Sequence, residues 1–149
     1  MTRDELAKER LKLKKESEVQ KEIRQYLKDT RRPYTITDAT KALNIKGQQV
    51  QRVIEGWPDL TTITTNARMF CIEVKRPFRG YLSREQALRL RKLHQAGVLI
   101  CIARSVEDVQ ETEALGQARE CDLAEIERTI AKPVKSPFAS KPIDPELGL

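Results

Sequence analysis

The hydrophobic positions near the start of the chain recur at the spacing of an α-helix. Val19, Ile23 and Leu27 lie four residues apart with mostly charged and polar residues between them, and this period predicts one helix over residues 4–29. The first half of this helix is almost entirely charged, so residues 1–15 are expected to project from the body of the protein.

A second helical signal follows in residues 36–54. Apolar residues on both sides of Asn44 predict two short helices, which form a helical pair inserted after the first helix. The same stretch resembles a helix-turn-helix unit, in which Gln48, Gln49 and Arg52 would be available to contact DNA. A plain helical insert is the other interpretation of this segment.

The middle of the chain changes to strand-like patterning. Residues 60–65 are rich in β-branched side chains and predict a strand. Asn66-Ala67 predicts a turn, and residues 69–75 predict a second strand.

The pattern then predicts a helix, a strand and a helix. Ser83 followed by Gln86 forms a capping box that begins a helix ending at Gly97. Residues 98–103 are a continuous apolar run, typical of a strand covered on both faces. An acidic amphipathic segment predicts one further helix, which starts at Val106. The strand–helix–strand order favours a parallel crossover, and therefore an α/β fold with a mixed sheet and helices on both sides.

Composition sets bounds on domains and compartment. The chain has 149 residues, of which 39% are hydrophobic and 34% charged, enough for one domain with a core. We expect that domain over residues 1–132, followed by a Pro-rich tail over residues 133–149. No apolar run approaches the roughly 20 residues needed to cross a bilayer, and the first residues lack an apolar signal segment. A cytoplasmic protein with no membrane partner is expected.

Charge is distributed unevenly along the chain. The formal net charge is +6, made up of +4 over residues 1–32, +7 over residues 33–104 and −5 over residues 105–149. A basic body with an acidic C-terminal part favours a polyanionic partner on one face.

Candidate chemistry lies at Asp59, Glu73 and Lys75. The strand period of two places Glu73 and Lys75 on one face, where charge within an apolar strand is costly unless it serves a site. Carboxylates on neighbouring strands suit a hard cation such as Mg²⁺. Asp59 and Glu73 can share a cation only if they lie opposite each other in the two antiparallel strands, so that the residue numbers of every pair add to 132. This register predicts an odd-length turn or a bulge near Asn66. The alternative is an ordinary surface strand with a Glu–Lys pair.

Several segments together resemble one nuclease family. The segments are Gly56-Trp57-Pro58-Asp59, Ile72–Pro77, Gly80–Gln86, and Ala96-Gly97 before a hydrophobic strand. They look like the VRR-NUC domain, a branch of the PD-(D/E)XK nuclease superfamily whose small stand-alone members are typical of phages and bacteria. The resemblance covers roughly residues 14–110, skips the helical pair, and implies a restriction-endonuclease-like fold.

The resemblance implies a role for each matching residue. Asp59 and Glu73 would bind Mg²⁺ or Mn²⁺, and Lys75 would orient or help activate the attacking water and stabilise charge on the phosphate. Gln86 matches a family glutamine at the start of a helix. As the third residue of a capping box, Gln86 could equally bond to the Ser83 backbone.

The family also has a glutamate in its first helix, upstream of an apolar residue and a glutamine, here Val19-Gln20. Glu16 and Glu18 are the two candidates. At about 100° per residue, Glu16 falls on the apolar face that contains Ile23, whereas Glu18 falls on the opposite side. A metal-binding glutamate must face the sheet, so we expect Glu16 to be the third metal ligand.

Residues 75–84 form a loop rich in basic and aromatic side chains. Contact with DNA phosphates by Arg76, Arg79 and Arg84 is expected, because guanidinium groups beside a carboxylate site can hold a polyanionic backbone. Gly80 would permit close approach of the backbone. An ordinary solvated basic loop is the alternative.

These expectations point to a Mg²⁺- or Mn²⁺-dependent deoxyribonuclease without a small-molecule cofactor. The resemblance implies an endonuclease acting on branched or flapped DNA, located in the host cytoplasm if a phage encodes it. A homodimer would allow one small domain to engage two strands. Two alternatives are a non-catalytic DNA-binding protein that uses a helix-turn-helix at residues 36–54, and a virion or scaffold protein with a retained nuclease fold.

Overall fold

The computed structural model describes residues 1–37, 42–45, 48–51 and 55–133. Its elements are, in chain order, α1 (Arg3–Leu13), α2 (Glu16–Asp29), β1 (Tyr34–Ile36), β2 (Ala42–Ile45), β3 (Gln48–Gln51), β4 (Leu60–Ile63), β5 (Met69–Val74), α3 (Arg84–Gln95), β6 (Leu99–Ala103), α4 (Val106–Leu115) and α5 (Glu120–Ala131).

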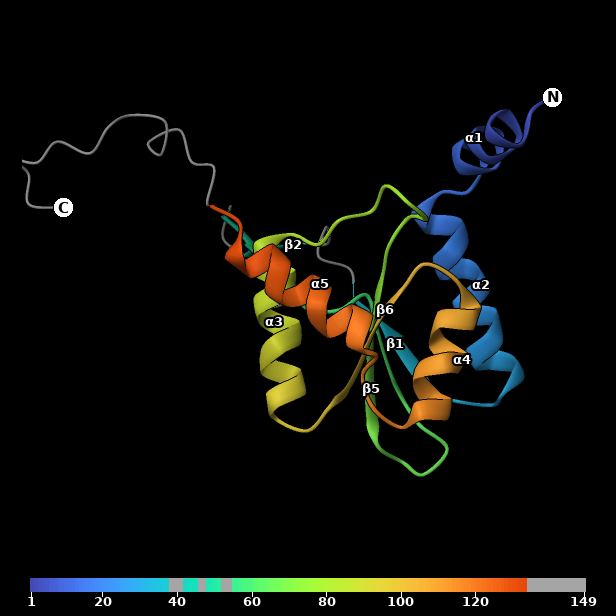
Figure 1. The fold of residues 1–149 in the computed structure, drawn as a ribbon. Helices are drawn as coiled ribbons and strands as arrows, with labels where there is room; N and C mark the ends of the chain where they lie inside the picture. Colours follow the sequence, from blue (N-terminus) through green and yellow to red (C-terminus); the bar gives the residue numbers. More distant parts are fainter. Residues whose placement is uncertain (38–41, 46–47, 52–54, 134–149) are drawn as a thin grey trace, which may run out of the picture.

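The centre of the fold is a four-stranded mixed sheet in the order β1-β4-β5-β6. β4 pairs antiparallel with β1 and β5, whereas β6 pairs parallel with β5. Helices α2 and α4 cover one face of the sheet, and α3 and α5 cover the other (Figure 1). The predicted α/β class, with a mixed sheet between helical layers, is therefore confirmed.

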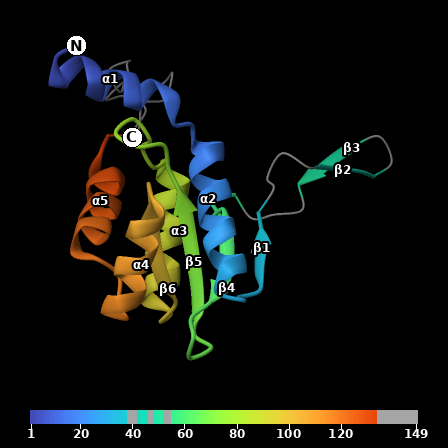
Figure 2. The ribbon, with the colours of Figure 1, turned by 90° about the vertical axis from the view of Figure 1, so that its right-hand side faces the viewer.

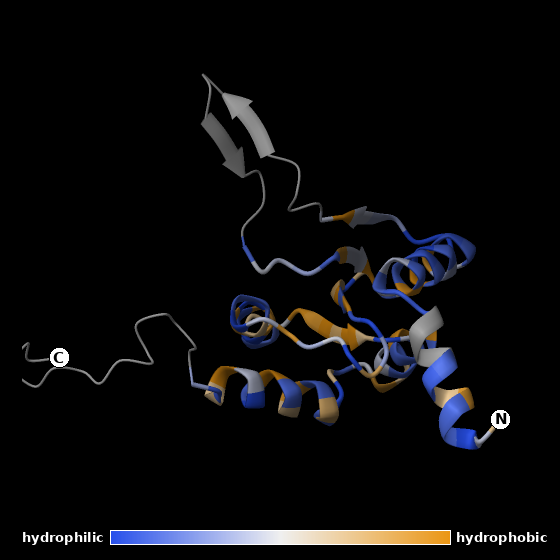
Figure 3. Cartoon of the chain, turned by 90° about the horizontal axis from the view of Figure 1, so that it is seen from above, coloured by the Kyte–Doolittle hydropathy of each residue, from blue (hydrophilic) through white to orange (hydrophobic). Residues whose placement is uncertain are grey.

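Strand β5 supplies side chains to both layers of the core because alternate residues point to opposite faces. Phe70, Ile72 and Val74 pack with the apolar face of α2. Cys71 packs on the other side with side chains of α3 and α5. Hydrophobic residues are concentrated on the strands and on the helix faces turned toward them (Figure 3).

The prediction of one continuous helix over residues 4–29 is wrong. Lys14 and Lys15 have extended backbone conformations, and α1 and α2 are separate helices (Figure 2). α2 has a buried apolar face formed by Val19, Ile23 and Leu27. Residues 3–9 are all exposed, so no packing against the sheet keeps α1 on the axis of α2.

The predicted helical pair is also wrong. β2 and β3 form an antiparallel hairpin in which Leu43 pairs with Val50 and Ile45 with Gln48. The helix-turn-helix hypothesis therefore fails, and Gln48 and Gln49 belong to a strand; Arg52 lies outside the described residues. The missed signal is the period-two spacing of Leu43 and Ile45, followed by a glycine, which suits the two-residue loops of hairpins.

The acidic segment after β6 contains two helices instead of the one predicted. Gly116 ends α4 in a left-handed conformation at φ 66°, which is the usual glycine termination. The break allows α4 to pack against the α2 side of the sheet while α5 packs against the α3 side. One straight helix could not cover both faces.

A buried arginine closes the outer edge of β6. Arg119 donates to the Ile102 carbonyl at 2.9 Å and to Asp122 at 2.9 Å, and Asp122 accepts from the Ile102 N–H at 3.2 Å. These bonds satisfy backbone groups of an edge strand that would otherwise be available for pairing with another chain. None of the helices in the described ranges is both long and apolar enough to cross a membrane.

Candidate functional site at the end of strand β5

The register of the β4–β5 hairpin brings Asp59 opposite Glu73. Leu60 pairs with Ile72 and Ile63 with Met69, so the residue numbers of each pair add to 132. Thr64 donates to the Arg68 carbonyl at 2.8 Å, which leaves a three-residue turn. The predicted odd-length turn is confirmed.

The turn has a left-handed residue, Ala67 at φ 63°. This conformation is typical of three-residue hairpin loops and is usually taken by glycine. Because the turn has three residues, the Asp59 and Glu73 carboxylates lie on the same face of the sheet. A two-residue turn would have placed them on opposite faces.

Asp59 is fastened to the neighbouring strand by its own side chain. Its Oδ2 accepts a hydrogen bond from the Val74 N–H at 2.8 Å, and its carbonyl accepts from the Thr37 N–H at 2.8 Å. Burial raises the pKa of the Asp59 carboxyl, although the bond from Val74, a hydrogen bond with the Glu73 carboxyl and the charge of Lys75 partly oppose this shift. Asp59 is thus held in place beside the end of β5.

Glu73 is the most unusual group of the site. It is 1% exposed, and its carboxyl oxygens receive no hydrogen bond from a backbone, amide or hydroxyl group of the described residues; the group that its carboxyl meets is the Asp59 carboxyl. Burial and then repulsion by Asp59 raise its pKa to about 9, and Lys75 offsets only part of this shift. The Lys75 ammonium, 3.6 Å from Glu73 Oε1, offsets only part of the cost of ionising this buried carboxyl, so a bound cation would favour the ionised form.

Lys75 and Gln86 connect β5 to helix α3. The Lys75 Nζ lies 3.6 Å from Glu73 Oε1 and donates to Gln86 Oε1 at 2.9 Å. The same Gln86 oxygen accepts from the Ser83 N–H at 2.9 Å, and Ser83 Oγ accepts from the Gln86 N–H at 3.1 Å. Gln86 therefore completes the predicted capping box and also positions the ammonium group of Lys75.

Glu16 is in the first turn of α2. Partial burial raises the pKa of its carboxyl, the charge of Lys75 lowers it, and the charge of Asp59 raises it again. Repulsion from Glu16 in turn contributes to the raised pKa of Glu73. The first turn of α2 thus contributes a third carboxylate to the electrostatic environment of Asp59 and Glu73.

Two glycines allow the backbone segments of the site to approach closely. A Cβ on Gly56 would lie 2.5 Å from the Glu85 carbonyl oxygen, so this glycine lets the segment before Asp59 pack on the start of α3. A Cβ on Gly80 would lie 2.6 Å from the Arg76 nitrogen and 2.9 Å from the Lys75 Cβ. The close approach expected at Gly80 is therefore made to its own loop.

The arginines expected to contact phosphate differ in environment. Arg79 is exposed, whereas Arg76 is half-buried. Arg84 is exposed but donates to the Ile130 carbonyl at 2.6 Å, which ties the start of α3 to the end of α5. Arg84 thus has a structural contact that the sequence did not suggest.

Sequence reasoning missed Arg104. Its guanidinium donates to the Gly80 carbonyl at 2.7 Å and to Glu125 at 2.6 Å. The side chain therefore anchors the loop that follows Lys75. The only available signal was its position directly after the buried strand at residues 99–103, which places it at the same sheet end as the site.

The donor set fits a hard divalent cation. Within the described residues, no three or more His, Cys, Asp and Glu side chains form a ready-made metal cluster, so Glu16, the expected third ligand, does not join Asp59 and Glu73 in one. Mg²⁺ does not require one, because it binds through one or two carboxylates and keeps several waters. The buried carboxyl oxygens of Glu73 beside Asp59 provide ligands of the required type.

Comparison of the chain with protein-family models, with curated proteins and with solved structures finds no match. A function for the chain must therefore be argued from the chemistry of this site and from the motifs in the sequence.

Proposed function

We propose that this protein is a Mg²⁺- or Mn²⁺-dependent DNA nuclease with a restriction-endonuclease-like fold. The observation that carries the proposal is the buried Glu73 carboxyl, which lies beside the Asp59 carboxyl and 3.6 Å from the Lys75 ammonium. The resemblance of the sequence to the VRR-NUC domain supports the same function, because the residues that match the family's motifs lie together at the end of β5.

Asp59 and Glu73 would hold the cation, and Glu16 would complete the ligand set. The Val74 N–H fixes Asp59 through its Oδ2, so Oδ1 is already oriented and little side-chain entropy is lost when a cation binds. Glu16 is preferred to Glu18 because its carboxyl interacts with Lys75 and Asp59. The bound cation would supply positive charge that polarises the phosphodiester and favours ionisation of a water.

Lys75 would act on the substrate from the same face as Glu73. Its ammonium group, held by Gln86, is positioned to stabilise negative charge that develops on the phosphate and to orient the attacking water. A fixed donor in a partly buried site does this more effectively than a solvated one, because less reorganisation is needed. Gln86 acts as a positioning residue for Lys75.

The proposed substrate is DNA, with branched or flapped forms suggested by the family resemblance. Arg79 and the other basic groups of the loop would hold the backbone phosphates. We also propose that the protein is a homodimer. Light scattering tests this, because a molar mass equal to that of the monomer alone would rule out the dimer.

A cleavage panel tests the proposed function. Linear, flapped, four-way and closed circular DNA are incubated with Mg²⁺, and hydrolysis should vanish in EDTA and in Asp59→Asn or Glu73→Gln. Cutting of the closed circle identifies an endonuclease, since that substrate has no ends. The matched pair Glu16→Gln and Glu18→Gln removes one charge from the same helix, and only the first should abolish cleavage.

Two results would overturn the proposal. Cleavage that persists in EDTA or in Glu73→Gln would show that the carboxylate site does not catalyse it. A pure protein that cuts none of the four substrates, with either Mg²⁺ or Mn²⁺, would leave a scaffold role as the better interpretation.

A further inference from the structure

The loop after Lys75 presents two aromatic side chains to solvent. Phe78 is 77% exposed and Tyr81 is 73% exposed, whereas the other aromatic residues of the described chain are buried or half-buried. Large apolar side chains this exposed, and this close together in the chain, indicate a contact surface rather than part of the core.

Phe78 adopts a strained backbone conformation. Its φ is 64°, in the left-handed region that bulky residues rarely occupy. An exposed side chain on a strained backbone does not stabilise the fold, so a phenylalanine at this position requires another explanation. Strained residues of this kind concentrate where a side chain must be presented to a ligand.

The surrounding loop is held in one shape. The Gly80 N–H donates to the Arg76 carbonyl at 3.0 Å, and the Arg79 N–H donates to the Pro77 carbonyl at 2.8 Å. Arg104 fixes the Gly80 carbonyl at 2.7 Å. The aromatic side chains are therefore carried by an ordered loop, which reduces the entropy lost when a ligand binds.

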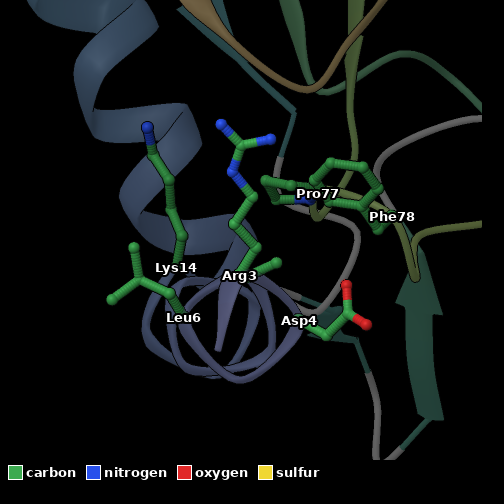
Figure 4. Close-up of a pocket in the computed structure, with 7 residues that line it drawn as sticks. Arg3, Asp4, Leu6, Lys14, Pro77 and Phe78 are labelled. Atoms are coloured by element: carbon green, nitrogen blue, oxygen red, sulfur yellow. The ribbon is translucent and has the colours of Figure 1, made fainter. Parts of the chain in front are cut away.

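The two aromatic residues line clefts with charged borders, and the Lys132 ammonium lies over the Tyr81 ring, 5.6 Å from its centre. One cleft of about 570 Å³ contains Phe78 and Tyr81 together with Lys14 and Arg104. A second cleft, of about 730 Å³, lies between α1 and the loop, with Arg3, Asp4 and Lys14 on the helix side and Phe78 on the other (Figure 4). An aromatic wall beside Arg3 and the exposed Arg79 of the same loop suits a ligand with flat apolar rings and anionic groups.

The clefts adjoin the candidate active site. The loop begins at Lys75, and Gly80 packs directly on the Lys75 side chain. Lys14 lies two residues before Glu16 in the chain. A polymer held by the carboxylate site would therefore pass next to Phe78 and Tyr81.

We infer that Phe78 and Tyr81 stack on unpaired bases of a DNA strand next to the phosphate that is cut. Base–aromatic stacking suits single strands, because bases within a duplex already stack on their neighbours. The exposed Arg3 and Arg79 side chains would neutralise the flanking phosphates, because Lys14 and Arg104 already pair with Glu22 at 2.8 Å and with Glu125 at 2.6 Å. This inference rests on the proposed function for the position of the scissile phosphate, and it names the substrate class as DNA with a single-stranded segment.

A binding assay tests this inference without requiring cleavage. Fluorescence anisotropy in EDTA measures the affinity of the full chain for a labelled 20-nucleotide single strand and for the matching duplex. The single strand should bind more tightly. Phe78→Ala and Tyr81→Ala should each weaken single-strand binding about 5- to 150-fold, while duplex affinity changes less than about 2-fold. Phe78→Tyr should retain binding because it keeps an aromatic face.

Two controls separate stacking from folding defects. Phe78→Gly suits the left-handed backbone and should leave the melting temperature unchanged or raised, yet it should lose single-strand affinity like Phe78→Ala. Leu115→Ala removes another exposed apolar side chain, 52% exposed on α4, and should change neither affinity. A 2-aminopurine in the single strand should be quenched by the native protein but not by Phe78→Gly.

The outcomes distinguish the inference from the proposed function. Equal single-strand affinity in native protein and Phe78→Gly, or binding of neither DNA form, overturns the inference. If the protein cleaves DNA with Mg²⁺ but the Phe78 variants bind the single strand as tightly as the native protein, the inference is overturned while the nuclease proposal stands. Selective, Phe78-dependent binding without any cleavage supports stacking and removes the nuclease proposal. A preference for duplex DNA also contradicts the inference.

Discussion

Replacing Glu73 by glutamine should stabilise the metal-free protein at neutral pH even though it removes the proposed activity. Glu73 is 1% exposed, receives no hydrogen bond from a backbone, amide or hydroxyl group of the described residues, and lies beside the Asp59 carboxyl. Keeping a negative charge there is unfavourable, so the folded protein binds a proton that the unfolded chain releases. Glutamine has nearly the same shape but no charge to compensate.

The size of the effect follows from the pKa of Glu73, which rises from 4.5 to about 9 on folding. Between these values the unfolded state binds fewer protons than the folded state, so the free energy of unfolding falls as pH rises. The slope is about 1.36 kcal/mol per pH unit, or at most about 3 kcal/mol between pH 4.5 and pH 7. The glutamine variant lacks this slope.

Urea denaturation between pH 5 and pH 8, in EDTA and in Mg²⁺, measures the effect. The difference in free energy of unfolding between Glu73→Gln and the native chain should grow with pH in EDTA. Mg²⁺ should stabilise the native chain by about 2.7 kcal/mol at a concentration 100 times its dissociation constant, and should stabilise Glu73→Gln far less. Glu18→Gln, which removes a charge from an exposed position, controls for net charge.

The decisive observation is how the difference in free energy of unfolding changes with pH. Any pH-independent cost of burying the glutamine amide adds the same amount at every pH and does not affect this change. If the difference between Glu73→Gln and the native chain is the same at pH 5 and pH 8 in EDTA, Glu73 is not held protonated, and the reasoning from its burial fails. If Mg²⁺ stabilises both proteins equally, Glu73 is not a ligand.

Three further substitutions test the framework around the site, each by urea denaturation. Arg119→Ala should cost about 3–5 kcal/mol, because it leaves Asp122 buried without its partner; a loss below about 1 kcal/mol would contradict this. Ala67→Gly should stabilise by about 1 kcal/mol, since φ is 63° there; a destabilised variant would argue against the observed turn. Gly56→Ala should destabilise by about 1–3 kcal/mol, because its Cβ would meet the Glu85 carbonyl at 2.5 Å, and an unchanged protein would rule out that contact.

Local patterns predicted the elements that have strong periodicity or caps. The Ser83–Gln86 capping box begins α3, and the continuous apolar run forms the fully buried strand β6. The chemical requirement that Asp59 meet Glu73 also predicted the hairpin register, in which the residue numbers of each pair add to 132. These features are decided by neighbouring residues, so the sequence contains enough information.

Elements with weak or ambiguous patterns were mispredicted. The three-residue strand β1 is too short to show a period and exists because it pairs with β4. The segment that forms β2 and β3 has few apolar residues, which fit a helix or a hairpin equally well. The breaks at Lys14-Lys15 and at Gly116 depend on which sheet face each helix covers, and this is a property of the whole fold.

The sequence by itself determined the alternation that puts Glu73 and Lys75 on one face of β5, the capped helix that follows, and the excess of basic residues around them. Only the tertiary structure decided that Glu73 loses its solvent, that Gln86 holds Lys75, and that the first turn of α2 brings Glu16 near Asp59. The physical reason is that burial and through-space charge arise where layers distant in the chain pack together. A local pattern specifies the direction of a side chain, whereas the packed fold sets its neighbours, its dielectric environment and its pKa.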